Sequence, residues 1–193
     1  MTLKRIFIAF LGILAIGISF FYFTGKGKTI KSRVRLEMIG MGLVGTKNDP
    51  KTSIEAEFDY SGTFADINGN RVSLEDFKGK TLFINIWASW CGPCRLEMPY
   101  IQSLYGKVKD NPDVEFLMVA IDEDFAKSKN FIQDKGYTFP VFHADEGLNP
   151  SIYTKAIPTT VVVSPEGKVI YYLNGTNNFD TDQFRDFLLT SSK

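Results

Sequence analysis

The chain has 193 residues, which is enough for one ordinary domain and some additional segments. Hydrophobic residues make up 44% of it and charged residues 23%, as in a globular protein. Residues 58–193 carry 13 lysines and arginines against 18 aspartates and glutamates, a net charge of −5. This balance argues against nucleic-acid binding, which needs a basic face.

The N-terminus is predicted to anchor the chain in a membrane. Residues 1–5 are short and basic, and residues 6–23 form an apolar run without charge or proline. A helix of this length reaches about 27 Å, close to the roughly 30 Å hydrocarbon core of a bilayer. A cleaved signal peptide is the alternative, but no convincing small-residue cleavage site follows the run.

Residues 24–57 are predicted to be a linker, and a folded domain is expected over residues 58–193. Residues 1–57 carry 9 lysines and arginines against 4 acidic residues, a net charge of +5. The basic part of the linker suits contact with anionic lipid headgroups. An ordinary solvated linker explains the same charges equally well.

Strands and helices are expected to alternate through the domain. We expect strands at 58–60, 63–66, 71–73, 81–88, 114–121, 138–143, 159–164 and 168–173. We expect helices or helical turns at 74–77, 93–109, 125–135, 148–153 and 181–190. Two of the strands are continuous apolar runs, which indicates burial on both faces. The order predicts an α/β fold, a mixed central sheet with helices on both faces.

The only two cysteines, Cys91 and Cys94, lie where the strand at 81–88 turns into the helix at 93–109. A helix N-terminus offers unpaired N–H groups and the positive end of the helix dipole, which stabilise a thiolate. We therefore expect Cys91 to be an exposed nucleophile and Cys94, one turn deeper, to close a redox-active disulfide with it. Gly92 permits the tight turn, and Pro93 suits the first helical turn.

Other interpretations of the cysteine pair are weaker. A zinc site needs about four protein ligands, and the chain offers no further cysteine and one histidine, His143. A purely structural disulfide would close too small a loop to constrain the unfolded chain much. We therefore expect a redox site without metal or cofactor.

The block Asn-Ile-Trp-Ala-Ser-Trp-Cys-Gly-Pro-Cys-Arg-Leu-Glu-Met-Pro, residues 85–99, resembles the active-site block of the thioredoxin superfamily. More narrowly, it is similar to that of the membrane-anchored TlpA/ResA-like branch. The resemblance extends over residues 58–193. It implies a thioredoxin fold with an N-terminal strand extension and a helix–strand insertion at about residues 122–145.

The resemblance also implies roles for residues around the cysteines. Pro158 is implied to be cis and to lie opposite them, so that the backbone of Ile157 can pair with an extended client segment. An ordinary trans proline at a strand start is the alternative. Glu97 is implied to be buried and to relay the cysteine protons, although a carboxylate placed for the helix dipole would share its position. Trp90 is expected to shield the pair.

Asn85 and Trp87, which belong to this block, and the lone histidine His143 are interpreted separately. Asn85 stands where thioredoxin proper carries a buried aspartate, which shifts the proton relay toward Glu97. Trp87 is expected in the core, and His143 is expected to be structural because it has no second ligand.

These features predict a membrane-anchored, extracytoplasmic thiol–disulfide oxidoreductase. The Gly-Pro pair between the cysteines is typical of reducing thioredoxins, whose potentials lie near about −270 mV. The resemblance implies disulfides of exported proteins such as apocytochrome c as substrates, and a membrane thiol-electron donor of the CcdA/DsbD type. Export conflicts with a positive-inside count, because more basic residues follow the apolar run than precede it. The alternative function is a membrane-tethered binding or chaperone module without redox turnover.

Overall fold

The computed structural model describes residues 56–144, 147–148, 151–152, 154 and 156–192. The expected basic N-terminus, the expected membrane anchor and nearly all of the expected linker therefore lie outside the described residues. The last two linker positions, Ala56 and Glu57, form a strand instead. Within the described part of the chain, no helix is both long and apolar enough to cross a bilayer.

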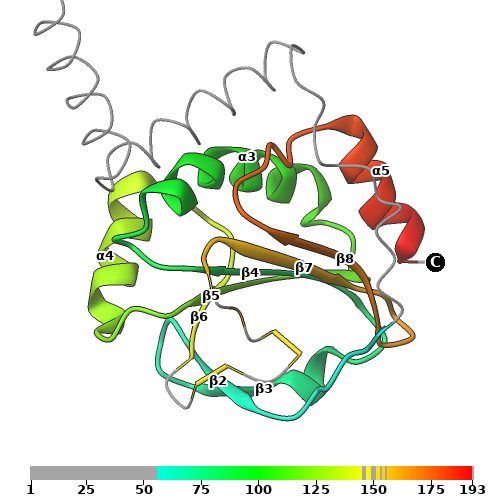
Figure 1. Ribbon diagram of the computed structural model, residues 1–193, viewed down its shortest axis with the longest axis horizontal. Helices are drawn as coiled ribbons and strands as arrows, with labels where there is room; N and C mark the ends of the chain where they lie inside the picture. The colour runs from blue at the N-terminus through cyan, green and yellow to red at the C-terminus, as the bar shows by residue number, and fades with distance from the viewer. Residues whose placement is uncertain (1–55, 145–146, 149–150, 153, 155, 193) are drawn as a thin grey trace, which may run out of the picture.

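One mixed sheet of eight strands, in the order β1-β8-β7-β4-β5-β6-β2-β3, organises the described residues (Figure 1). The strands are β1 (Ala56–Glu57), β2 (Thr63–Asp66), β3 (Arg71–Ser73), β4 (Thr81–Trp87), β5 (Val114–Ala120), β6 (Val141–His143), β7 (Thr159–Val163) and β8 (Lys168–Asn174). The helices are η1 (Leu74–Phe77), α3 (Gly92–Val108), α4 (Phe125–Lys135) and α5 (Asp182–Ser191). Strands β4, β5 and β6 run parallel, and the other neighbouring strands are antiparallel.

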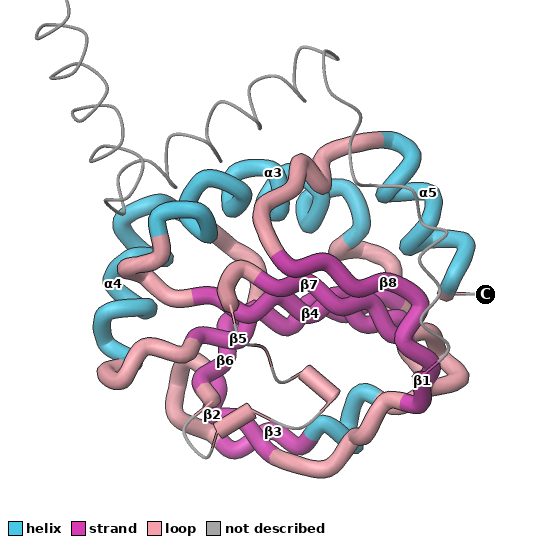
Figure 2. The backbone as a smooth tube through the Cα atoms, viewed as in Figure 1, coloured by secondary structure: helices cyan, strands magenta, loops and turns pink. Residues whose placement is uncertain are grey.

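The two faces of the sheet are covered differently. Helices α3, α4 and α5 share one core with the side chain of Phe83 in β4. The adjacent residue Ile84 points to the other core, which it shares with Phe64 of β2 and Leu74 of η1. Figure 2 shows the helices on one side of the central strands and the β2–β3 hairpin with η1 on the other. The expectation of helices on both faces therefore holds only through the single turn of η1.

The expected strand at residues 58–60 is wrong. The strand in this region is β1, which pairs with Lys168 and Val169 of β8. The N–H of Phe58 still donates to the carbonyl of Gly167 (2.7 Å), the chain then leaves the sheet edge, and the side chains of Phe58 and Tyr60 pack in the core on the η1 side. Apolar burial at these positions thus comes from a covering loop and not from strand pairing.

Two further expected elements differ in the structure. The strand expected at 138–143 begins only at Val141, because the N–H of Thr138 donates to the side chain of Gln102 in α3 (2.8 Å). At 148–153, where a short helix was expected, the described residues Ser151 and Ile152 form a turn. Ile152 is nevertheless fully buried, which explains its apolar pattern.

Candidate active site

Strand β4 delivers the chain to a turn that holds the cysteine pair. Cys91 is the N-cap of α3 and is disulfide-bonded to Cys94, with the two Cα atoms 5.3 Å apart. The backbone N–H of Cys94 donates to the sulfur of Cys91 at 3.1 Å. Gly92 and Pro93 occupy the first helical positions, where the missing N–H of proline leaves no bond unmade. The expected placement of Cys91 at a helix N-terminus is confirmed.

The accessibility of this site differs from the expectation. Cys91, expected to be exposed, is only 4% exposed, and Cys94 is completely buried. The disulfide explains the difference, because it ties the sulfur of Cys91 to that of a residue inside the core. Trp90, expected to shield the pair, is itself 67% exposed and projects from the surface beside Cys91.

Glu97 lies one helical turn after Cys94 and is fully buried. Its Oε1 accepts a hydrogen bond from Nδ2 of Asn85 (2.9 Å), and its Oε2 accepts one from the backbone N–H of Asn177 (3.2 Å). Burial raises the pKa of Glu97 to about 8, although both hydrogen bonds oppose that shift. Because Glu97 is buried and lies beyond the first turn of α3, placement for the helix dipole does not account for it.

The hydrogen bonds of Glu97 continue into a buried network. Asn85 also donates to the hydroxyl of Thr160 on the paired strand β7 (2.9 Å). The side chain of Asn177 donates to the hydroxyl of Tyr171 (3.3 Å), whose pKa is raised to about 12, mainly by burial. Sequence reasoning missed Thr160, Tyr171 and Asn177. The only visible signal for Asn177 was the polar run at 174–178 between two apolar elements.

A second buried carboxylate holds the turn that precedes the cysteines. Asp122, just after β5, is 2% exposed and accepts hydrogen bonds from the N–H of Ser89 (2.9 Å) and from the hydroxyls of Ser89 and Ser128 (both 2.6 Å). Ser128 belongs to α4, so Asp122 ties the turn after β4 to a neighbouring helix. Sequence reasoning missed Asp122, although an acidic residue directly after a buried strand was a usable signal.

His143 takes part in structure and not in a cluster of ligands. Its Nε2 donates to the backbone carbonyl of Asp122 (2.8 Å), and its ring stacks on Phe125 with centroids 4.7 Å apart. Across the described ranges, no group of three or more histidine, cysteine, aspartate or glutamate side chains could hold a metal ion.

The peptide bond between Ile157 and Pro158 is cis, as expected. Pro158 directly precedes β7, whose first residue, Thr159, pairs with Ile86 near the end of β4. The cis-proline and the cysteine turn therefore lie at the same end of the neighbouring strands β4 and β7. Ile157 is half-buried and packs against both cores.

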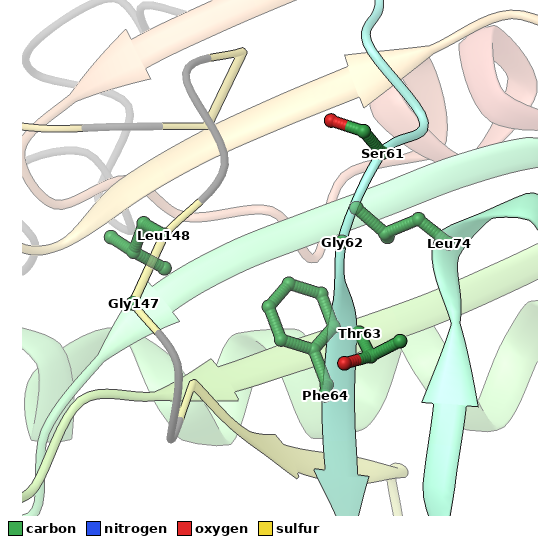
Figure 3. A pocket seen from close by; sticks show the side chains of 7 residues that line it. All are labelled: Ser61, Gly62, Thr63, Phe64, Leu74, Gly147 and Leu148. Atoms are coloured by element: carbon green, nitrogen blue, oxygen red, sulfur yellow. The ribbon is translucent and has the colours of Figure 1, made fainter.

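None of the predicted site residues lines either of two hollows in the described part of the structure. The larger one, about 400 Å³, is lined in part by Asp122 and His143, so it adjoins the turn before the cysteines. The smaller one, about 190 Å³, lies between β2 and residues 147–148. Figure 3 shows Leu148 on one side of it and Phe64 on the other. Among the described residues that line the smaller hollow, none has an ionisable side chain.

Comparisons with known proteins agree with this geometry. The Redoxin family model matches residues 48–187. The thiol-disulfide oxidoreductase ResA of Bacillus subtilis (strain 168) is 38% identical over 112 residues, which are 58% of this chain and 62% of that relative. ResA of Bacillus thuringiensis subsp. konkukian is 36% identical over 124 residues, 64% of this chain and 70% of the relative.

Among solved structures, the thioredoxin domain of a thiol-disulfide oxidoreductase from Bacteroides vulgatus superposes with a TM-score of 0.58 at 24% identity. The superposition covers 72% of this chain and 99% of that one. It shows a shared thioredoxin-like fold.

Proposed function

The chain belongs to the Redoxin family, and from that premise we propose that it is a thiol–disulfide oxidoreductase acting through Cys91 and Cys94. The observation that carries the proposal is the Cys91–Cys94 disulfide at the N-terminus of α3, one turn from the buried carboxyl of Glu97. A helix N-terminus favours a thiolate, and only a thiolate attacks a disulfide.

In the proposed reaction, the thiolate of Cys91 attacks one sulfur of a client disulfide. The client S–S bond breaks, a mixed disulfide forms at Cys91, and one client thiolate leaves. Cys94 then gives its proton to Glu97, and the resulting thiolate attacks the sulfur of Cys91. The mixed disulfide breaks, the second client thiolate leaves, and two electrons have passed from the cysteine pair to the client.

Glu97 suits the role of proton acceptor for Cys94. An ordinary cysteine has a pKa of about 8.5, and burial brings the pKa of Glu97 to about 8. Proton transfer between groups of similar pKa has little thermodynamic cost, which is the condition for efficient general-base catalysis.

We propose that the cysteine pair works as a reductant. The support is the Gly92–Pro93 pair, which reducing thioredoxins with potentials near about −270 mV also carry. The test is to equilibrate the protein with thiol–disulfide buffers and measure its reduction potential. A potential as oxidising as that of DsbA, about −120 mV, would remove the reductase direction.

The setting of the enzyme is part of the proposal. We place an anchor at residues 6–23, a linker after it and the thioredoxin-like domain at about 58–193 on the extracytoplasmic side of a cell membrane. The apolar run at 6–23 and the TlpA/ResA-like block at 85–99 support this. The clients would be exported proteins with disulfides, such as apocytochrome c. The electron donor would be a membrane thiol carrier of the CcdA/DsbD type.

Trapping tests both the reaction and its setting. In the full chain, Cys94→Ser should hold clients as mixed disulfides at Cys91, and the double variant Cys91→Ser/Cys94→Ser should hold none. Absence of any trapped protein in cells, together with normal client maturation in the double variant, would instead support a tethered binding module. Protease treatment of intact cells would report on which side the domain lies.

A further inference from the structure

The amide of Asn85 is the one partner of Glu97 that can both donate and accept hydrogen bonds. It is 1% exposed, and its Nδ2 donates to Oε1 of Glu97 and to Oγ1 of Thr160, both at 2.9 Å. Its Oδ1 is buried and has no hydrogen-bond partner within the described residues. A buried amide oxygen without a partner is unfavourable, so its presence beside an ionisable group calls for an explanation.

The observed orientation of the amide suits a Glu97 whose Oε1 accepts, as both oxygens of a carboxylate do. A carboxylate accepts hydrogen bonds, so it fits the N–H of Asn85. A protonated carboxyl group carries an O–H, which would then face that N–H. Because the two ends of an amide are nearly the same size, a half-turn of the Asn85 amide would present Oδ1 to the acid instead.

Thr160 permits the same half-turn. Its hydroxyl accepts from Asn85 in the observed orientation and could donate to Oδ1 in the rotated one, since a hydroxyl does both. The amide position without a partner stays the same, and only the atom that occupies it changes. The observed orientation leaves Oδ1 without a partner, and the rotated one leaves the two N–H groups of Nδ2 without one, so rotation requires that the bonds gained with protonated Glu97 and with Thr160 offset this cost.

The surroundings of Glu97 direct the proton to the side of Asn85. The other oxygen, Oε2, accepts from the backbone N–H of Asn177, which can only donate. The further titratable groups near Glu97 are Cys94, one turn earlier on the same helix, and Tyr171, which is linked through the side chain of Asn177. A proton taken from Cys94 is therefore best placed on Oε1.

We propose that Asn85 is a positioning residue whose amide rotates as Glu97 gains and loses its proton, donating to the carboxylate and accepting from the acid. This inference rests on the proposed function, in which Glu97 takes the proton of Cys94. It gives Glu97 a hydrogen-bond partner in both states, so that neither state leaves the carboxyl group unpaired in the core.

Nuclear magnetic resonance tests the rotation directly. In the reduced full chain, the side-chain amide signals of Asn85 should titrate with the same midpoint as the carboxyl carbon of Glu97, and the titration should vanish in Glu97→Gln. A titrating Glu97 beside unchanging Asn85 amide signals would overturn the proposal. A Glu97 that does not titrate between about pH 6 and pH 10 would overturn both its proton relay and the inference.

Kinetics of the second step provide the independent test. The rate at which Cys94 releases the client from the mixed disulfide should rise with pH as Glu97 loses its proton. Asn85→Leu removes a donor to the carboxylate, so the midpoint should move up by about one pH unit and release at pH 7 should slow about tenfold. Thr160→Val removes only the hydrogen bond between Thr160 and the Asn85 amide, so it should raise the pH midpoint by less than Asn85→Leu does. This variant replaces Asn85→Leu in the test if Asn85→Leu does not fold.

Thr81→Val is the matched control. Thr81 lies on the same strand, is also fully buried, and its hydroxyl has no partner in the described structure. Its pH profile should match that of the unaltered chain. If Asn85→Leu lowers the rate of client release at every pH without moving the pH midpoint, the role of Asn85 is merely structural and the inference is wrong. If Glu97→Gln releases clients at the normal rate, the proton relay itself fails.

Discussion

At the scale of single residues, two carboxyl groups are buried by different means. Glu97 accepts two N–H donors, and burial still raises its pKa to about 8. Asp122 accepts three donors, two of them hydroxyl groups at 2.6 Å. All three donors belong to the turn before the cysteines or to α4, so the bonds of Asp122 hold these two segments together. We therefore assign proton exchange to Glu97 and a structural role to Asp122.

The first prediction concerns Glu97→Gln. The amide keeps the size of the side chain but cannot take the proton of Cys94, so client release should slow by about a hundredfold or more. The first attack by Cys91 should change little, since Glu97 acts on the second cysteine. Stopped-flow measurement of mixed-disulfide formation and decay separates the two steps. Equal slowing of both steps would contradict the assignment.

Glu115→Gln is the matched control for this prediction. Glu115 is partly exposed on β5 and pairs with Lys80 at 2.6 Å, away from the cysteines. The same chemical change there should leave both steps unaltered.

Sequence reasoning singled out Glu97 and Asn85 but not Asn177, the other partner of Glu97. Glu97 follows Cys94 by three residues, and helical spacing alone brings such positions to one face. Asn177 is 80 residues from Glu97 along the chain, and only the sheet topology brings them together. The burial of Cys91 also escaped prediction, because the N-cap position says nothing about which way the sulfur turns when the disulfide forms.

At the scale of elements, the turn between β4 and α3 is held from outside by Asp122. Its bonds to Ser89 and to Ser128 join this turn to α4. The turn sets where Cys91 caps α3, so its rigidity is part of how the thiol is presented.

The second prediction is that Asp122→Asn destabilises the domain by about 1–3 kcal/mol, because an amide cannot accept from all three donors as the carboxylate does. Denaturant unfolding measures the loss. In the reduced form, the variant should also alkylate at Cys91 with a wider range of rates, since the turn is less fixed.

Asp124→Asn offers the control two residues away. Asp124 caps α4 by accepting from the N–H of Ala126 (2.9 Å), and asparagine caps helices about as well as aspartate. This variant should cost only a few tenths of a kcal/mol. If both variants lost equal stability, Asp122 would have no special part in holding the turn.

Elements with a strong apolar period were predictable, and those decided by tertiary contacts were not. The helix at 125–135 was predicted with the bounds that α4 has in the structure, where Asp124 and Gly136 cap its two ends. The strand expected at 58–60 failed because its aromatic residues are buried by a loop that covers the sheet. Apolar residues at a short stretch indicate burial but do not distinguish strand from covering loop.

At the scale of the whole molecule, the mixed sheet followed from the order of elements, and the thioredoxin-like fold followed from the resemblance of the block at 85–99. What the order could not give is the asymmetry of the layers. All three described α-helices cover one face, and the β2–β3 hairpin with η1 covers the other. In the segment expected to be helical at 148–153, the described residues Ser151 and Ile152 form a turn, from which Ile152 is buried in the core on the η1 side.

The third prediction links the active site to the stability of the whole domain. Burial raises the pKa of Glu97 from 4.5 to about 8, so the folded chain holds a proton that the unfolded chain has released between these values. As far as Glu97 is concerned, stability should therefore be full below about pH 4.5, fall by up to about 5 kcal/mol between about pH 4.5 and pH 8, and level off above pH 8. Denaturant unfolding of the reduced and oxidised forms at pH 5, 7 and 9 measures this slope. Glu97→Gln should flatten it, because the neutral side chain has no proton to lose, and an unchanged slope in that variant would assign the pH dependence to other groups.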